Sequence, residues 1–189
     1  MPVFEKEGPQ NSRETLKIAI DTARERNISD IVIASTTGST VAKLDDFDLS
    51  GLHVVIVTHS YGSPTNGTNR ISRETREIYR QKGYDVVTAA HVLSGVERSL
   101  SSLKGGIYPG EIISEALKMV SRGTKVAVEI TAMACDAGVI QPAVPVIAVG
   151  GSGSGADTAV IIRGAHAQRI LETRIDEFLC KPIGTLIQK

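Results

Sequence analysis

Aromatic residues and excess charge are scarce in this sequence. The chain of 189 residues has no tryptophan, three phenylalanines and four tyrosines. Its core must therefore be aliphatic, and the length suffices for one well-packed domain. Lys plus Arg and Asp plus Glu number 21 each, which gives a formal net charge of zero. This balance gives no indication of a nucleic acid or an anionic membrane as a partner.

Long apolar runs and closely spaced cysteines are also missing. No run approaches the ~20 apolar residues that a membrane span needs. Residues 1–7 do not have the pattern of a signal peptide. The two cysteines, Cys135 and Cys180, do not have the spacing of a metal-binding motif, and we interpret both as reduced thiols. We therefore expect a single cytoplasmic domain over residues 1–189.

The most informative stretch is a short β-branched run, residues 30–34, followed by a loop rich in hydroxyl groups. The run is typical of a strand that is buried on both faces. A helical pattern begins at Val41 and continues to about Phe47. Unpaired N–H groups at a helix N-terminus, together with hydroxyl donors, would bind an anion, and phosphate is the commonest biological one. The alternative is that one hydroxyl merely caps the helix. The loop consists of Ser35, Thr36, Thr37, Gly38, Ser39 and Thr40.

A second apolar run, His53–Thr58, follows the short helical pattern. A helix between two apolar strands predicts a βαβ unit with parallel strands and a right-handed crossover. Further strands are expected at residues 85–89, 145–149 and 158–162, and helices at residues 72–82, 111–121 and 125–137. The segments 11–14 and 94–97 have the pattern of capping boxes.

The helical pattern from Lys125 to Ala137 is apolar on most sides, so we expect it to be buried. Glu129, Thr131 and Asp136 lie within it. Polar residues on so buried a helix either pair structurally or face a ligand, and we favour a structural role for them.

Two further loops follow apolar strands. The loop at 59–69 is polar and contains Gly and Pro, and the loop at 150–157 is the most glycine-rich segment of the chain. Glycines let a backbone approach a ligand closely, although the first loop could be a plain solvent loop and the second a hairpin connection. The second loop leads into a strand, so it is not the dinucleotide-binding fingerprint, which must open a helix. The candidate residues of these loops are His59, Tyr61, Gly62, Gly150, Gly151, Ser152 and Gly153.

The carboxyl ends of parallel strands lie at one edge of an open α/β sheet, where ligands bind. We therefore expect the hydroxyl loop, the two later loops and His91 to meet there. The sequence shows no carboxylate pair, metal cluster, clear Ser–His–Asp spacing or Walker lysine. The absence of these motifs favours binding of a phosphorylated small molecule over hydrolysis, and it leaves the catalytic residues unassigned.

Together the patterns predict an α/β fold of three layers, α/β/α, with a mostly parallel sheet. Residues 169–182 alternate in character and predict an antiparallel C-terminal extension that ends in an edge strand. Pairing of that strand with a second copy would be a route to a homo-oligomer, which the sequence leaves open.

The helix over residues 15–23, the strand over 30–34, the hydroxyl loop and the strand over 54–57 resemble the C-terminal α/β domain of pyruvate kinase. In that domain a similar loop holds a phosphate of the allosteric sugar bisphosphate. The segments 91–99 and 155–159 resemble stand-alone archaeal and bacterial proteins that are similar to this domain, some of which are described as carrying FMN.

The resemblance implies FMN, or a ligand of similar shape, at the edge of the sheet. Its phosphate would lie on residues 36–40 and its ring near His59, Tyr61 or the loop 150–155. A flavin-dependent oxidoreductase is one expectation, and a non-catalytic sensor of a phosphorylated metabolite is the alternative. The chain departs from the kinases because it has no catalytic barrel, so pyruvate kinase activity is not expected. Ser39 also stands where the kinases often have a basic residue.

Overall fold

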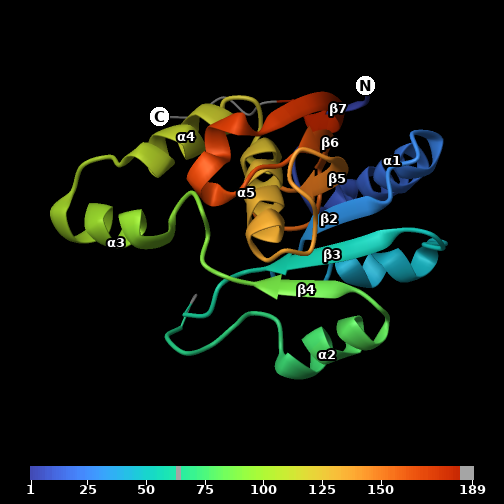
Figure 1. Cartoon of the computed structure of the whole chain (residues 1–189), viewed down its shortest axis with the longest axis horizontal. Helices are drawn as coiled ribbons and strands as arrows, with labels where there is room; N and C mark the ends of the chain where they lie inside the picture. Colours follow the sequence, from blue (N-terminus) through green and yellow to red (C-terminus); the bar gives the residue numbers. More distant parts are fainter. Residues whose placement is uncertain (63–64, 184–189) are drawn as a thin grey trace.

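The computed structural model describes residues 1–62 and 65–183, so Ser63 and Pro64 of the expected polar loop lie outside the described residues. One sheet of seven strands runs in the order β1-β7-β6-β5-β2-β3-β4 (Figure 1). The strands are β1 (Val3–Phe4), β2 (Asp30–Ala34), β3 (His53–Thr58), β4 (Asp85–Thr88), β5 (Pro145–Gly150), β6 (Thr158–Arg163) and β7 (Arg174–Pro182). The helices are α1 (Ser12–Glu25), α2 (Arg73–Gln81), α3 (Gly95–Lys104), α4 (Pro109–Lys118) and α5 (Arg122–Asp136). Three 3-10 helices are η1 (Pro9–Asn11), η2 (Val41–Asp46) and η3 (Ala167–Glu172).

The central strands are parallel, as predicted. β2 pairs with β3 and β5, and β3 pairs with β4, all in parallel register. β6 then reverses against β5, and β7 reverses against β6. The chain is therefore an α/β fold with a mixed sheet and an antiparallel C-terminal extension.

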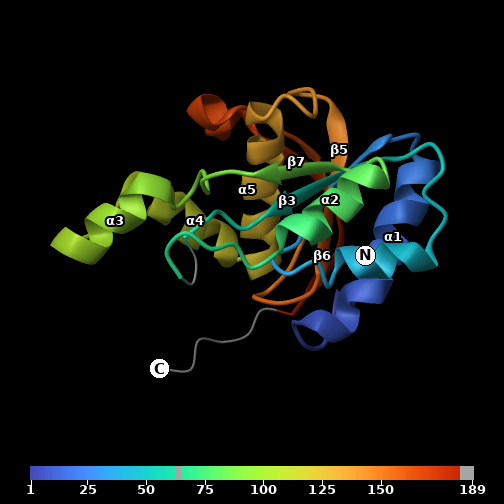
Figure 2. The same ribbon diagram turned by 90° about the horizontal axis from the view of Figure 1, so that it is seen from below.

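Two aliphatic cores flank the sheet, because the central strands are buried on both faces. On β2, Ile31 and Ile33 pack with α1 and α2, whereas Val32 between them packs with α5 on the opposite face (Figure 2). Each fully buried side chain of this size contributes roughly 1.5–3 kcal/mol. The three layers follow from this double burial.

α5 is the buried helix that the sequence predicted, but it begins earlier than expected. Ser121 Oγ accepts a hydrogen bond from Thr124 N at 2.9 Å, so the cap is Ser121 rather than Thr124. The first turn can approach the sheet because it contains Gly123. A Cβ on Gly150 would lie 2.3 Å from the Gly123 carbonyl oxygen, so helix and strand are in backbone contact there.

Several local expectations about helix type and helix ends were wrong. The segment after the hydroxyl loop is the 3-10 helix η2, not an α-helix. Asn11 makes no cap hydrogen bond, since its side chain donates to Lys6 O at 2.7 Å. The Glu97 carboxylate accepts from Gly110 N at 2.8 Å on α4, which leaves Ser94 without the reciprocal box. α4 runs from Pro109 to Lys118, so it begins and ends two to three residues earlier than the expected helix 111–121.

The prediction of a C-terminal edge strand was also wrong. Residues 167–172 form η3, and β7 starts at Arg174. β7 is not an edge, because β1 pairs with it in parallel, with Val3 opposite Lys181. A strand of two residues has no periodicity that a sequence pattern could detect.

α3 and α4 extend away from the sheet (Figure 1). α3 has no buried residue, and its Val96 and Leu103 are 77% and 76% exposed. Among the described residues, none of the helices has the length and apolar character that crossing a membrane requires.

Candidate functional site

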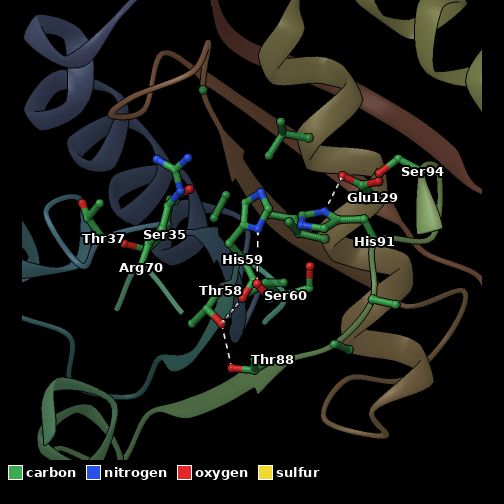
Figure 3. Close-up of a pocket in the computed structure, with 18 of the residues that line it drawn as sticks. Ser35, Thr37, Thr58, His59, Ser60, Arg70, Thr88, His91, Ser94 and Glu129 are labelled. Atoms are coloured by element: carbon green, nitrogen blue, oxygen red, sulfur yellow. Dashed lines mark hydrogen bonds and ion pairs between the residues drawn. The ribbon is translucent and has the colours of Figure 1, made fainter. Parts of the chain in front are cut away.

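A cleft of about 1040 Å³ lies at the carboxyl edge of the sheet (Figure 3). Its walls come from the segments after β2, β3, β4 and β5, with α3 and α5 completing the rim. The topology therefore brings together three loops that are far apart in the sequence. The predicted residues that line the cleft are Ser35, Thr36, Thr37, Ser39, Thr40, His59, Tyr61, Gly62, His91, Gly151 and Gly153.

Three predicted residues do not line the cleft. Gly38 has a φ of +92°, and a Cβ there would lie 2.9 Å from the Tyr79 hydroxyl, so it faces α2. Its carbonyl oxygen accepts a hydrogen bond from that hydroxyl at 3.1 Å. Gly150 faces α5, and Ser152 donates its N–H to the Asp157 carboxylate at 3.2 Å. These three residues shape the loops rather than the surface of the cleft.

The hydroxyl loop provides donors, though not the helix end that we expected. η2 is a 3-10 helix of six residues, too short to supply a substantial dipole. However, the backbone N–H groups from Thr36 to Thr40 donate to no backbone carbonyl of the described residues. Ser35 is 3% exposed, and its Oγ has no hydrogen-bond partner within the described part of the chain. The loop therefore presents unused donors at the wall of the cleft.

Three cations line the cleft and were missed by the sequence analysis. Arg70 follows the loop after β3, Arg98 lies on α3 and Lys125 on α5. Among the described lining residues Glu129 is the only carboxylate, and it pairs with Lys125. Counting positive residues in the segments expected at this edge would have found Arg70 and Arg98. The excess of positive charge favours an anionic ligand.

Glu129 and His91 form a carboxylate–histidine pair inside the cleft. His91 Nδ1 lies 3.1 Å from Glu129 Oε2, and Leu93 N donates to Glu129 Oε1 at 3.1 Å. The Glu129 side chain is 3% exposed. Burial alone would raise the pKa of Glu129, but the His91 hydrogen bond and the Lys125 charge lower it to about 2. Glu129 thus has the structural pairing that we favoured, and it also lines the cleft.

His59 lies against this pair. Its ring centroid is 4.5 Å from that of His91, with an interplanar angle of 61°. Burial lowers the pKa of His59, and so do the nearby charges of His91, Arg70 and Arg98. These surroundings therefore favour the neutral form of the His59 ring. In Figure 3, His59 lies between Arg70 and His91.

Tyr61 is at the rim and is 54% exposed. Its hydroxyl accepts a hydrogen bond from Arg76, whose guanidinium also lies 5.1 Å from the centre of the ring. Another wall of the cleft is the glycine loop, which Asp157 fixes in place. The fully buried Asp157 carboxylate accepts hydrogen bonds from Gly8 N at 3.0 Å and Ser152 N at 3.2 Å.

The described residues contain no group of three or more His, Cys, Asp or Glu side chains that could hold a metal ion. A phosphorylated cofactor such as FMN does fit the donor set. The hydroxyl loop and Arg70 could hold its phosphate, and His59, Tyr61 and the backbone of Gly151 could border its ring.

Comparison with known proteins identifies the family. The family model for the pyruvate kinase alpha/beta domain matches residues 13–162. Among solved structures, a pyruvate kinase from Cryptosporidium parvum matches with a TM-score of 0.43 and 15% sequence identity, over 82% of this chain and 23% of that one. The protein therefore spans less than a quarter of that enzyme. Because the family model covers most of the sequence, the chain belongs to the pyruvate kinase alpha/beta domain family.

Proposed function

We propose that the protein binds a phosphorylated small molecule in the cleft, with FMN as the first candidate. One observation carries the proposal. The hydroxyl loop, whose N–H groups beyond Ser35 and whose Ser35 Oγ have no hydrogen-bond partner among residues 1–62 and 65–183, lies in the same cleft as Arg70 and Arg98. Hydroxyl and N–H donors beside guanidinium groups form the usual environment of a bound phosphate.

FMN is preferred within this class because of the resemblance and the size of the cleft. Pockets for ligands of this kind have volumes of about 300–1,000 Å³, and this cleft has about 1040 Å³. The flavin ring would lie towards His59 and the glycine loop. A bound flavin would supply electron-transfer chemistry, so the enzymatic form of this proposal is a flavin-dependent oxidoreductase.

A second candidate function uses the same site. Membership of the pyruvate kinase alpha/beta domain family favours a sensor that binds a phosphorylated metabolite without chemistry. Turnover of a bound cofactor with an electron donor separates the two functions, because a sensor would show none.

The first experiment identifies the ligand. Purified protein is denatured, and any released small molecule is identified by mass spectrometry. Ligand-free protein is then titrated with FMN, riboflavin and a sugar bisphosphate. We expect FMN to bind at least about tenfold more tightly than riboflavin, because riboflavin lacks the phosphate and its charge-assisted hydrogen bonds.

The variants Arg70→Gln and Arg98→Gln test where the phosphate lies. Loss of either guanidinium should reduce the affinity for FMN by about tenfold or more. Arg73→Gln is the matched control, because Arg73 is exposed on α2 and does not line the cleft. Equal affinity for FMN and riboflavin would contradict phosphate anchoring. Tight binding of the sugar bisphosphate without FMN binding would favour the sensor.

A further inference from the structure

Three side chains from different parts of the chain form a continuous line inside the cleft. His59 follows β3, His91 follows β4 and Glu129 lies on α5. Figure 3 shows His91 in the middle, with Glu129 on one side and His59 on the other. The line leads from a buried carboxylate to the open part of the cleft.

The position of one proton in this line follows from the contacts. Glu129 is ionised, since its pKa is lowered to about 2 by His91 and Lys125 in spite of its burial. An ionised carboxylate only accepts hydrogen bonds, so His91 Nδ1, at 3.1 Å, must carry a hydrogen. When the ring carries only this one hydrogen, its lone pair is on Nε2.

His91 Nε2 is buried and has no hydrogen-bond partner among the residues that the structure describes. A buried acceptor without a donor is costly, by about 1–3 kcal/mol. The neighbouring group on that side is the His59 ring. A half turn of this ring about its Cβ–Cγ bond exchanges its nitrogen and carbon positions without changing its shape, so His59 can present an N–H to Nε2.

We propose that the His59–His91 pair takes up one proton from solvent when a phosphorylated ligand binds, so that an imidazolium on His59 faces the ligand's anionic group. Glu129 acts as a positioning residue that keeps the His91 lone pair on the side of His59. The inference rests on the proposed function, because the anionic ligand is what makes protonation favourable. The proton comes from the buffer acid, which is left as its conjugate base.

The surroundings of His59 oppose its protonation in the absence of ligand. Burial is the main cause that lowers the pKa of His59, and the charges of Arg70 and Arg98 lower it further by smaller amounts, whereas the contact with Ser60 O at 3.4 Å raises it. A phosphate beside Arg70 would offset these positive charges and stabilise the protonated pair. The charged and titratable groups that line the cleft with the pair are Tyr61 and Arg70 after β3, Arg98 on α3, and Lys125 and Glu129 on α5.

Isothermal titration calorimetry measures the proton directly. Full-length protein is titrated with FMN and with inorganic phosphate in buffers of different ionisation enthalpy, and the slope of the observed enthalpy gives the protons taken up. We expect uptake approaching one proton near pH 7, and an FMN affinity that falls by up to about tenfold per pH unit above neutrality. His59→Gln should bind more weakly and take up no proton. His166→Gln, which removes an imidazole outside the cleft, should behave as wild type.

Nitrogen NMR of the four histidines, assigned by single variants, tests the positioning role of Glu129. Ligand-free His91 should carry its hydrogen on Nδ1, and Glu129→Gln should reduce that preference together with the proton uptake. If the Glu129→Gln variant is less stable but still takes up the full proton, Glu129 has only a structural role. That result would overturn its proposed role in positioning His91. His91 protonated on Nε2 in wild type would overturn the proposal.

The outcomes separate the two proposals. If FMN or phosphate binds without proton uptake, the proposed function stands and the protonatable pair is wrong. If neither binds, the cleft is not a phosphate site and both proposals fail.

Discussion

Replacement of Ser35 should affect the stability of the fold and the binding of ligand in opposite directions. The Ser35 hydroxyl is buried and lacks a partner among the described residues. Replacing an unsatisfied buried hydroxyl by a methyl group is neutral or stabilising, because no hydrogen bond is lost and no desolvated group remains. At the same time Ser35 lines the cleft in which we propose that the phosphate binds.

Ser35→Ala should therefore leave the free energy of unfolding unchanged or raise it by up to about 1 kcal/mol, and weaken FMN by roughly two- to tenfold. Urea unfolding and calorimetric titration measure the two effects. Ser12→Ala is the control, because the buried Ser12 hydroxyl donates to Pro9 O at 2.8 Å and accepts from Ala156 N at 2.9 Å. That variant should lose about 1–3 kcal/mol of stability. Equal destabilisation of both variants would mean that Ser35 has a structural partner.

Several of the predicted residues that line the cleft come directly after a β-branched strand. The hydroxyl loop and His59 follow such strands, so the parallel topology alone brings them together. The His91–Glu129 pair could not be foreseen in the same way. Its members are 38 residues apart, and their contact depends on how α5 crosses the sheet. Gly38 was expected in the cleft but faces α2. A glycine in a sequence indicates a flexible backbone, but it does not indicate which way that backbone faces.

At the scale of elements, α3 differs most from the rest of the fold. It has no buried residue, although it carries Val96, Leu100 and Leu103. A helix of this length is marginal in water without packing. α5, in contrast, is buried along most of its length.

Hydrogen exchange followed by mass spectrometry should show this difference. We expect amides of α3 to lose protection first and those of α5 last, because local opening is easiest where few apolar contacts are broken. α5 serves as the internal reference in the same sample. Protection of α3 comparable to that of α5 would contradict the exposed helix and indicate that a second copy covers it, which sedimentation would then show as a dimer.

The strands were predicted more accurately than the helix boundaries, and the reason is physical. Val, Ile and Leu runs define buried strands by themselves, so β3 matches the predicted range 53–58. Helix ends depend on which group satisfies the first N–H donors, and here distant partners often do so. Glu97 binds α4 rather than its own helix end, which no local pattern encodes.

For the whole molecule, His53 ties the stability of the sheet to pH. It lies on β3, and its ring bonds to Asp30 on β2 at 2.7 Å and to Asp85 on β4 at 2.9 Å. Burial lowers the pKa of His53, but the hydrogen bonds and charges of the two carboxylates outweigh it and raise the pKa above 6.5. The raised pKa means that protonated His53 favours the folded state. This stabilisation is complete below the pKa of the unfolded chain and is lost as the pH rises through the folded pKa.

Wild type should therefore lose stability relative to His53→Gln between about pH 6 and pH 8, by no more than about 1 kcal/mol for a partly exposed pair. Urea unfolding of both proteins across this range measures the difference. The comparison with the variant is needed because the lowered pKa of His59 contributes a slope of opposite sign. His166→Gln should retain the wild-type dependence, and a wild-type curve parallel to that of His53→Gln would contradict the prediction.

Two walls of the cleft differ in stiffness, because the Asp157 carboxylate supports only one of them, the glycine loop. This carboxylate binds Gly8 N, 149 residues away in sequence, and Ser152 N together, and a Cβ on Gly155 would lie 2.3 Å from Pro9 Cα. The glycine wall is therefore clamped to the N-terminal segment, whereas the rim at Val96 and Arg98 belongs to α3, a helix without buried residues that is bonded to α4. A bulky ligand can gain room by displacing α3 but not the glycine loop. The upper size limit of the ligand is therefore set by the compliance of one helix.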